Sequence, residues 1–323
     1  MWASLQKFFE GHPHIEASAL PLPKSFVLRR LSPFWLIGLL GGFFFASQVI
    51  VLPLIWVLLP LINPWLNALG ASDPLWAETV AFTLNLVIFF AGIYAVMYLW
   101  VRFVEHRSFR SLGFHRKPLK RFAFGFALAT TTMAVMAGLL LLFGDATLDA
   151  EGLRATGVEA LPYVLVVLLG WLVQGSAEEV LFQGWFMPTT SKLFGPVIGI
   201  GFSALMFAVF HALNPNMSVL AFVNLGLYGV FAALYALYEE GIVGIAAYHV
   251  AWNWAQGNVF GQGVSGSSSV DASLFNLTYQ SETLFNGGAF GPEGGLLTTL
   301  VLSVSIAGVV WLSRRKKKRL KAV

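Results

Sequence analysis

Long runs of apolar residues, separated by short polar stretches, follow one another along almost the whole chain. A helix needs about 20 apolar residues to cross the hydrocarbon core of a bilayer, and eight runs approach or exceed this length. Pro53 and Pro60 should bend or end the first of them. The pattern predicts an all-α, polytopic membrane protein with about eight transmembrane helices. The predicted spans cover residues 34–62, 75–103, 122–143, 161–188, 196–213, 219–238, 242–260 and 296–312.

The composition agrees with this prediction. Of the 323 residues, 57% are hydrophobic and only 11% are charged, whereas soluble domains carry about 25% charged residues. The chain contains no cysteine, which excludes disulfides, thiolate nucleophiles and thiolate metal ligands. The first apolar run is much longer than the roughly 7–15 residues of a signal-peptide core. We therefore expect residues 1–33 to be retained as a cytoplasmic N-terminal segment.

The distribution of lysine and arginine sets the expected orientation, because these residues concentrate in short cytoplasmic loops. With the N-terminus inside, 19 of the 20 lysine and arginine residues fall on the cytoplasmic side, and only Arg154 lies outside. An odd number of spans would place one of the basic ends on the wrong side. We expect both termini in the cytoplasm, a transmembrane domain over residues 34–313, and an outer loop over residues 261–295.

Seven basic residues crowd into the last ten positions, residues 314–323, and the chain carries a net charge of +4. A basic run directly after a transmembrane helix anchors its orientation and contacts anionic lipid headgroups. We interpret this segment as a basic cytoplasmic tail whose partner is the lipid bilayer, with no nucleic acid as a partner.

Ionisable residues inside the predicted spans are the strongest functional signal. Glu178 and Glu179 lie side by side in the fourth span. Charged groups in a membrane are costly, so they normally face a protein interior or a water-filled cavity. Because one residue turns a helix by about 100°, the two carboxylates cannot both point straight at one target. We expect Glu178 to act and Glu179 to be held by a neighbour.

The fourth and fifth spans should form a hairpin that brings Glu178 to His211. Glycine and proline are the strongest local breakers, so Gly195 and Pro196 predict the turn. Glu178 lies 16 residues before Phe194, and His211 lies 17 residues after it. Both side chains therefore fall at nearly the same depth, about 25 Å from the turn at the rise of a helix.

His249 and Asn253 add a second histidine and an amide. They lie four residues apart in the seventh span, so they share one helix face. A carboxylate and an imidazole beside one water form a general base, and a second histidine with an amide could donate hydrogen bonds to a developing oxyanion. The four residues together predict hydrolysis of a peptide bond. We expect Asn85 and Asn224, in other spans, to be structural.

The polar residues resemble the three motifs of the CPBP family of intramembrane proteases, named for CAAX proteases and bacteriocin-processing enzymes and also called the Abi family. The family motifs are EExxxR, FxxxH and HxxxN. They correspond here to Glu178-Glu179 with Gln183, to Phe207 with His211, and to His249 with Asn253. The resembling region covers residues 161–260.

This resemblance implies an eight-helix membrane enzyme with a conical catalytic cavity that opens to the cytoplasm. By analogy, Glu178 and His211 would activate water without a metal or other cofactor, and His249 and Asn253 would form the oxyanion hole. Glu179 would support them. The resemblance also implies a membrane-associated or lipidated protein or peptide as substrate, and we expect the plasma membrane of a prokaryote as the location.

One position departs from the family pattern. Gln183 stands where the family has arginine, and glutamine can donate a hydrogen bond but brings no charge. We expect Gln183 and Phe207 to support the site. The departure leaves open a non-catalytic immunity or scaffold protein with the same fold. A second alternative is a zinc metalloprotease in which Glu178, His211 and His249 bind the metal and water takes the fourth position.

Overall fold

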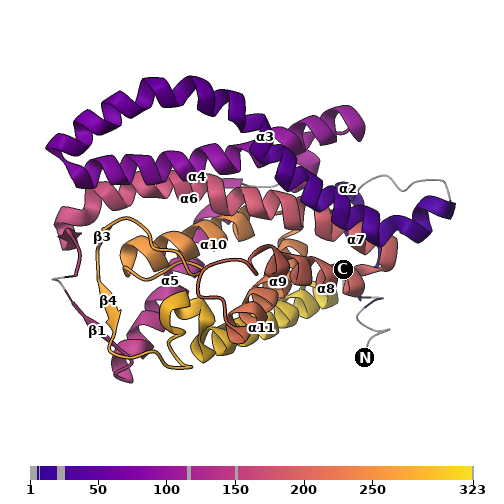
Figure 1. The fold of residues 1–323 in the computed structure, drawn as a ribbon. Helices are drawn as coiled ribbons and strands as arrows, with labels where there is room; N and C mark the ends of the chain where they lie inside the picture. Colours follow the sequence, from indigo (N-terminus) through magenta and orange to yellow (C-terminus); the bar gives the residue numbers. More distant parts are fainter. Residues whose placement is uncertain (1–5, 7, 20–25, 115–117, 150–151, 322–323) are drawn as a thin grey trace.

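A computed structural model describes residues 6, 8–19, 26–114, 118–149 and 152–321 of the chain. Helices make up most of it, and each of the eight predicted spans corresponds to one helix of 12 residues or more (Figure 1). The all-α, polytopic membrane fold is confirmed. The eight helices are α3 (Phe26–Ser72), α4 (Pro74–Leu99), α5 (Pro118–Leu142), α6 (Leu161–Glu179), α8 (Pro196–Phe210), α9 (Val219–Glu239), α10 (Val243–Trp254) and α11 (Leu296–Lys321).

The helices differ in length more than the apolar runs indicate. Within the described residues, six helical stretches are long and apolar enough to cross a membrane. Helix α8, at 15 residues, is a shorter apolar helix, and α10 has 12 residues before it continues as the π-helical segment Ala255–Val259. The six long stretches contain α3, α4, α5, α6, α9 and α11.

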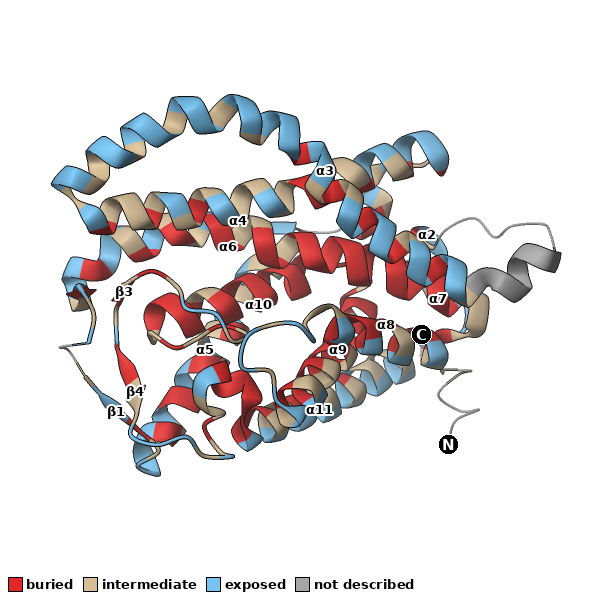
Figure 2. Cartoon of the chain, viewed as in Figure 1, coloured by how far each residue is buried: buried red, intermediate tan, exposed pale blue. Residues whose placement is uncertain are grey.

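Helix α3 corrects one predicted boundary. The prolines do not end it near residue 62, because it continues as one helix to Ser72 with Pro53, Pro60 and two further prolines inside. Each proline removes a backbone N–H and bends the helix, and α3 bows away from α4 in Figure 1. Figure 2 shows that most of this arch is exposed, as expected for a helix that faces lipid.

The segment over residues 261–295 packs against the end of the helices opposite both termini (Figure 1). Two short pairings hold it there. Strand β1 (Ala146–Leu148) pairs antiparallel with β4 (Leu277–Tyr279), and β2 (Ala155–Thr156) pairs parallel with β3 (Ala272–Ser273). Arg154 adds ion pairs to Glu78 and Asp271 on the same side. The segment is therefore fixed to the helices that form the site.

Helix α6 does not end at the glutamate pair. It continues through the π-helical segment Val180–Phe186 into α7 (Met187–Phe194). In this passage the backbone carbonyl of Gln183 lacks an N–H partner in the helix, because Met187 N–H bonds to the Phe182 carbonyl and Pro188 has no N–H. The predicted turn follows at Gly195, where φ is +91°.

The N-terminal helix α2 (Pro13–Ser18) supplies the missing donor. The His14 imidazole is fully buried, and its Nε2 lies 2.9 Å from the Gln183 carbonyl oxygen. Because a carbonyl only accepts, Nε2 carries the proton. Ser18, one helical turn further on, donates its hydroxyl to the Ser111 carbonyl at 2.6 Å. The segment that begins the chain thus stabilises the backbone directly after the two glutamates.

We predict that His14→Ala destabilises the protein by about 1–3 kcal/mol, the cost of leaving a buried carbonyl without its donor. Thermal unfolding of the purified chain in detergent would measure it. His14→Gln, which keeps an N–H that can reach the carbonyl, should recover part of the loss. Equal unfolding temperatures for the wild type and His14→Ala would contradict this role.

Candidate active site

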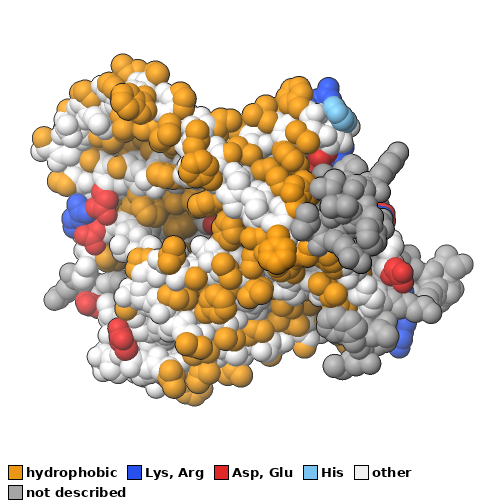
Figure 3. Space-filling model, turned by 45° about the vertical axis from the view of Figure 1, so that its right-hand side comes forward, with side chains coloured by type: hydrophobic (Ala, Val, Ile, Leu, Met, Phe, Trp, Pro, Cys, Tyr) orange, Lys and Arg blue, Asp and Glu red, His pale blue; other side chains and the backbone are white. Residues whose placement is uncertain are grey.

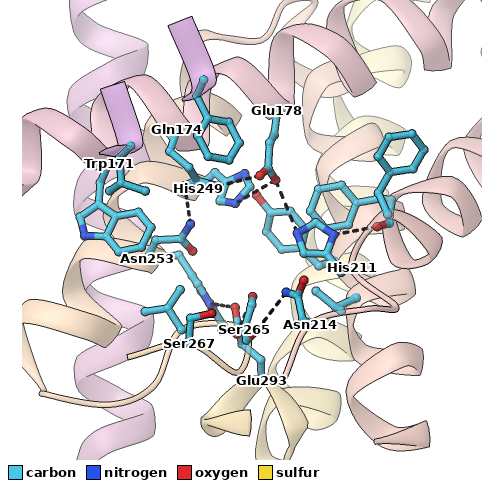
Figure 4. Close-up of a pocket in the computed structure, with 18 of the residues that line it drawn as sticks. Trp171, Gln174, Glu178, His211, Asn214, His249, Asn253, Ser265, Ser267 and Glu293 are labelled. Atoms are coloured by element: carbon cyan, nitrogen blue, oxygen red, sulfur yellow. Dashed lines mark hydrogen bonds and ion pairs between the residues drawn. The ribbon is translucent and has the colours of Figure 1, made fainter. Parts of the chain in front are cut away.

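A cavity of about 380 Å³ lies among α4, α6, α8, α9 and α10. Its wall from α4 is a stripe of side chains along one helix face, among them Phe82, Leu86 and Phe90. Opposite α4, polar side chains gather (Figure 4). Figure 3 shows a hollow on this side of the molecule, bordered by hydrophobic side chains and with an acidic group inside. The cavity therefore combines an apolar wall with a polar interior.

Helix α6 presents its two carboxylates to different surroundings, as the 100° turn per residue requires. Glu178 lines the cavity. Its Oε1 accepts a hydrogen bond from Gln174 Nε2 at 2.7 Å, while its Oε2 is buried without a hydrogen-bond partner among the described residues. Glu179 is fully buried and faces α9 and α10 instead. The pair is thus divided into one carboxylate at the cavity and one behind it.

His211 stands at the end of α8, as its C-cap residue. Its Nδ1 lies 2.8 Å from the Phe207 carbonyl oxygen, so this nitrogen carries a proton. In a neutral ring Nε2 is then an acceptor, and it lies 3.7 Å from Glu178 Oε2. The Phe207 ring packs on the imidazole, with ring centroids 4.6 Å apart. The FxxxH spacing therefore fixes both the tautomer and the orientation of His211.

His249 and Asn253 approach the glutamates from α10. The Nδ1 of His249 lies 2.9 Å from Glu179 Oε1, which also accepts a hydrogen bond from the Tyr228 hydroxyl at 3.1 Å. The Nε2 of His249 points toward Glu178 Oε2 at 3.9 Å. Glu179 thus holds His249, and His249 turns its free nitrogen into the cavity.

A second chain of hydrogen bonds joins Asn253, through Gln174, to Glu178. Asn253 Nδ2 donates to Gln174 Oε1 at 2.8 Å, and the Gln174 amide in turn donates to Glu178 (Figure 4). Gln174 lies one turn before Glu178. The structure therefore brings Glu178, His211, His249 and Asn253 to one cavity.

Gln183 lies elsewhere. It does not line the cavity, its side chain is fully buried, and neither amide atom has a hydrogen-bond partner among the described residues. Its backbone carbonyl accepts a hydrogen bond from His14 Nε2. The expected support from its side chain is not visible in these contacts.

Several cavity residues are absent from the sequence-based set: Gln174, Tyr228, Asn214, Ser265 and Glu293. The spacing of Gln174, four residues before Glu178, is the one signal that could have indicated a contact. A tyrosine in an apolar span looks like any packing aromatic. Asn224 makes contacts that fit the structural role expected for it. Its amide donates to the Glu293 and Gly295 carbonyls at 2.7 and 2.9 Å. It fastens α9 to the end of the 261–295 segment.

The cavity extends to the end of the helices that lies opposite the termini (Figure 1). Its lining includes Val264, Ser265, Ser267 and Ser268, from the segment opposite the termini, and no described residue of the terminal segments. This wall forms because residues 261–295 fold back over the ends of α9 and α10 (Figure 1).

Among the described residues, no three histidine, aspartate or glutamate side chains are placed to hold a metal ion. The zinc alternative proposed Glu178, His211 and His249 as ligands. The geometry of this part of the chain gives that alternative no support.

Residues 160–255 match the family model of Rce1-like, type II CAAX prenyl endopeptidases. This stretch contains Glu178, Glu179, His211, His249 and Asn253. No curated protein and no solved structure matches the chain. The match agrees with the resemblance of the motifs to the CPBP, or CAAX protease, family, and the apolar helices identify the chain as an integral membrane protein.

Proposed function

We propose that the protein is a metal-independent glutamic endopeptidase that cuts a membrane-associated or lipidated protein or peptide within the membrane. The observation that carries the proposal is the pairing of two hydrogen-bond acceptors across a small gap. Glu178 Oε2 has no hydrogen-bond partner among the described residues, and it faces His211 Nε2 at 3.7 Å.

A water molecule between these two atoms would be activated for attack. The 3.7 Å separation is too long for a direct hydrogen bond, and one bridging water suits such a distance. Because the neutral His211 ring accepts at Nε2, the water would donate one proton toward each base. Its lone pair would then point into the cavity, at the carbonyl carbon of the substrate.

The oxyanion that forms would face α10. One N–H of the Asn253 amide is committed to Gln174, and the other is free to donate to the oxyanion. When the His249 ring carries both protons, it donates from Nδ1 to Glu179 and can also donate from Nε2 to the oxyanion. Such a ring lies between two carboxylates, Glu178 and Glu179, which balance its charge.

Glu179 is a positioning residue in this mechanism. Its Oε1 accepts from both His249 and the Tyr228 hydroxyl, so it fixes the plane and tautomer of the ring from behind. It does not line the cavity. The proposal thus assigns unequal roles to the two adjacent glutamates.

For the location, we propose the plasma membrane of a prokaryote, with both termini in the cytoplasm. The bias of lysine and arginine supports this orientation. In that orientation the 261–295 segment forms an outer wall of the cavity, and the substrate would enter from the bilayer. Reporter fusions at the C-terminus and at residue 270 would test the two sides.

Glu178→Gln and His211→Ala should each lower kcat/KM by about 10²–10⁴, the contribution of a positioned general base. Cleavage of a synthetic peptide library by the purified chain, followed by mass spectrometry, would measure it. Glu282→Gln is the matched control, because Glu282 is exposed and outside the cavity. Wild-type cleavage by Glu178→Gln would favour a non-catalytic role for the fold.

Activity should persist after treatment with a chelator and exhaustive dialysis. The reason is that Glu178 and His211 supply the base directly. Metal content by mass spectrometry, measured on the same sample as the cleavage rate, checks this. Loss of cleavage that added Zn²⁺ restores would contradict the metal-independent mechanism.

Gln174→Leu should lower kcat/KM about ten- to hundredfold, which corresponds to the roughly 1.5–3 kcal/mol of a hydrogen bond to a charged group. The change removes the link between Asn253 and Glu178. Asn85→Leu is a suitable comparison, because Asn85 lines the same cavity from α4 but belongs to neither chain of hydrogen bonds. Equal losses in both variants would point to a general effect of cavity polarity.

A further inference from the structure

A third carboxylate, Glu293, lies at the same cavity and takes no part in the proposed chemistry. It lines the cavity and is 8% exposed. Its Oε2 accepts from the backbone N–H and the hydroxyl of Ser265, at 2.5 and 2.9 Å, and its Oε1 accepts from Trp252 Nε1 at 3.3 Å. All three donors are neutral.

Glu293 faces the catalytic groups across the cavity. In Figure 4, Glu178 lies on one side and Glu293 with Ser265 on the other, while His211, His249 and Asn253 lie between them. Asn214 steadies this wall by donating to the Ser265 carbonyl at 3.0 Å. A peptide held with its scissile bond at Glu178 would therefore pass along the wall that carries Glu293.

The charge of the cavity has one sign. Two carboxylates line it, and no lysine or arginine among the described residues does. The second oxygen of Glu178 is buried without a hydrogen-bond partner there, and Glu293 has only the weak 3.3 Å donor at Oε1. Charges in a cavity with low-dielectric walls act strongly on a bound ligand.

We propose that Glu293 is a specificity-determining residue that selects a cationic side chain, lysine or arginine, close to the scissile bond and disfavours a carboxylate there. This inference rests on the proposed function only for the location of the scissile bond. A substrate ammonium or guanidinium would complete the hydrogen bonding of Glu293 and balance the two carboxylates. An acidic residue, or a free C-terminal carboxylate, would meet two like charges and no cation.

The test measures binding, so that it does not depend on turnover. The full chain carrying His211→Ala, which keeps both cavity carboxylates, is titrated in neutral detergent with N-acetylated, C-amidated apolar peptides. These peptides bear a neutral fluorophore and differ only at the central residue, which is lysine, glutamine or glutamate. We expect lysine to bind at least about tenfold more tightly than glutamate, with glutamine between them.

Glu293→Gln in the same background should reduce that ratio to near one, while the exposed control Glu282→Gln leaves it unchanged. Ser265→Ala, which removes one donor but keeps the carboxylate, should retain the preference. Ser267→Lys places a cation on the same wall and should weaken or reverse the preference without altering Glu293. If Glu293→Gln does not fold, the Ser267→Lys variant still tests whether the charge of this wall sets the preference.

Equal binding of the lysine and glutamate peptides, or an unchanged ratio in Glu293→Gln and Ser267→Lys, would overturn the inference. Failure of the proposed function has a different signature. In that case the lysine preference would persist in binding, while the wild-type chain would cleave none of the library peptides.

Discussion

Two adjacent carboxylates inside an apolar helix impose the main constraint on this structure. An acidic side chain at the centre of a membrane costs roughly 2.5–3.5 kcal/mol on insertion scales, so each needs partners within the protein. Glu179 finds them in His249 and Tyr228, behind the cavity. Glu178 finds only Gln174 for one oxygen and leaves the other toward the cavity. Each glutamate keeps one oxygen without a hydrogen-bond partner among the described residues, but only Glu178 lines the cavity.

The surrounding helices keep Glu178 and Glu179 in these two different surroundings. Helix α10 is buried from Val243 to Asn253 and carries His249 to the two glutamates and Asn253 to Gln174. Helix α8 ends at the depth where His211 must stand. The passage from α6 into α7 needs a donor from outside the helix, and His14 provides it. The site is thus tied both to the N-terminal segment and, through Glu293 and Asn224, to the 261–295 segment.

The apolar pattern predicts the helices well, because burial in lipid leaves helices as the simplest way to satisfy the backbone. The proximity of Glu178 and His211 also follows from simple counting, since Gly195 breaks the chain midway between them. The remaining features depend on tertiary contacts that no local pattern encodes. Tyr228 and Glu293 become polar wall residues only because distant segments fold onto α10, and α3 passes its predicted end because proline bends a membrane helix without stopping it.

Gln183 departs from the family motif, and its contacts in the structure show what this departure changes. In the sequence, Gln183 stands where the family motif has an arginine. The absence of that arginine suggests a site that lacks one of its charged residues. In the structure, both glutamates have partners that do not include it: Gln174 for Glu178, and His249 with Tyr228 for Glu179. The Gln183 side chain is buried away from the cavity. The Gln183 backbone carbonyl, which accepts a hydrogen bond from His14, supports the helix that carries the glutamates. This contact does not depend on the identity of the side chain at position 183. Each glutamate therefore has a hydrogen-bond partner without a cation at position 183.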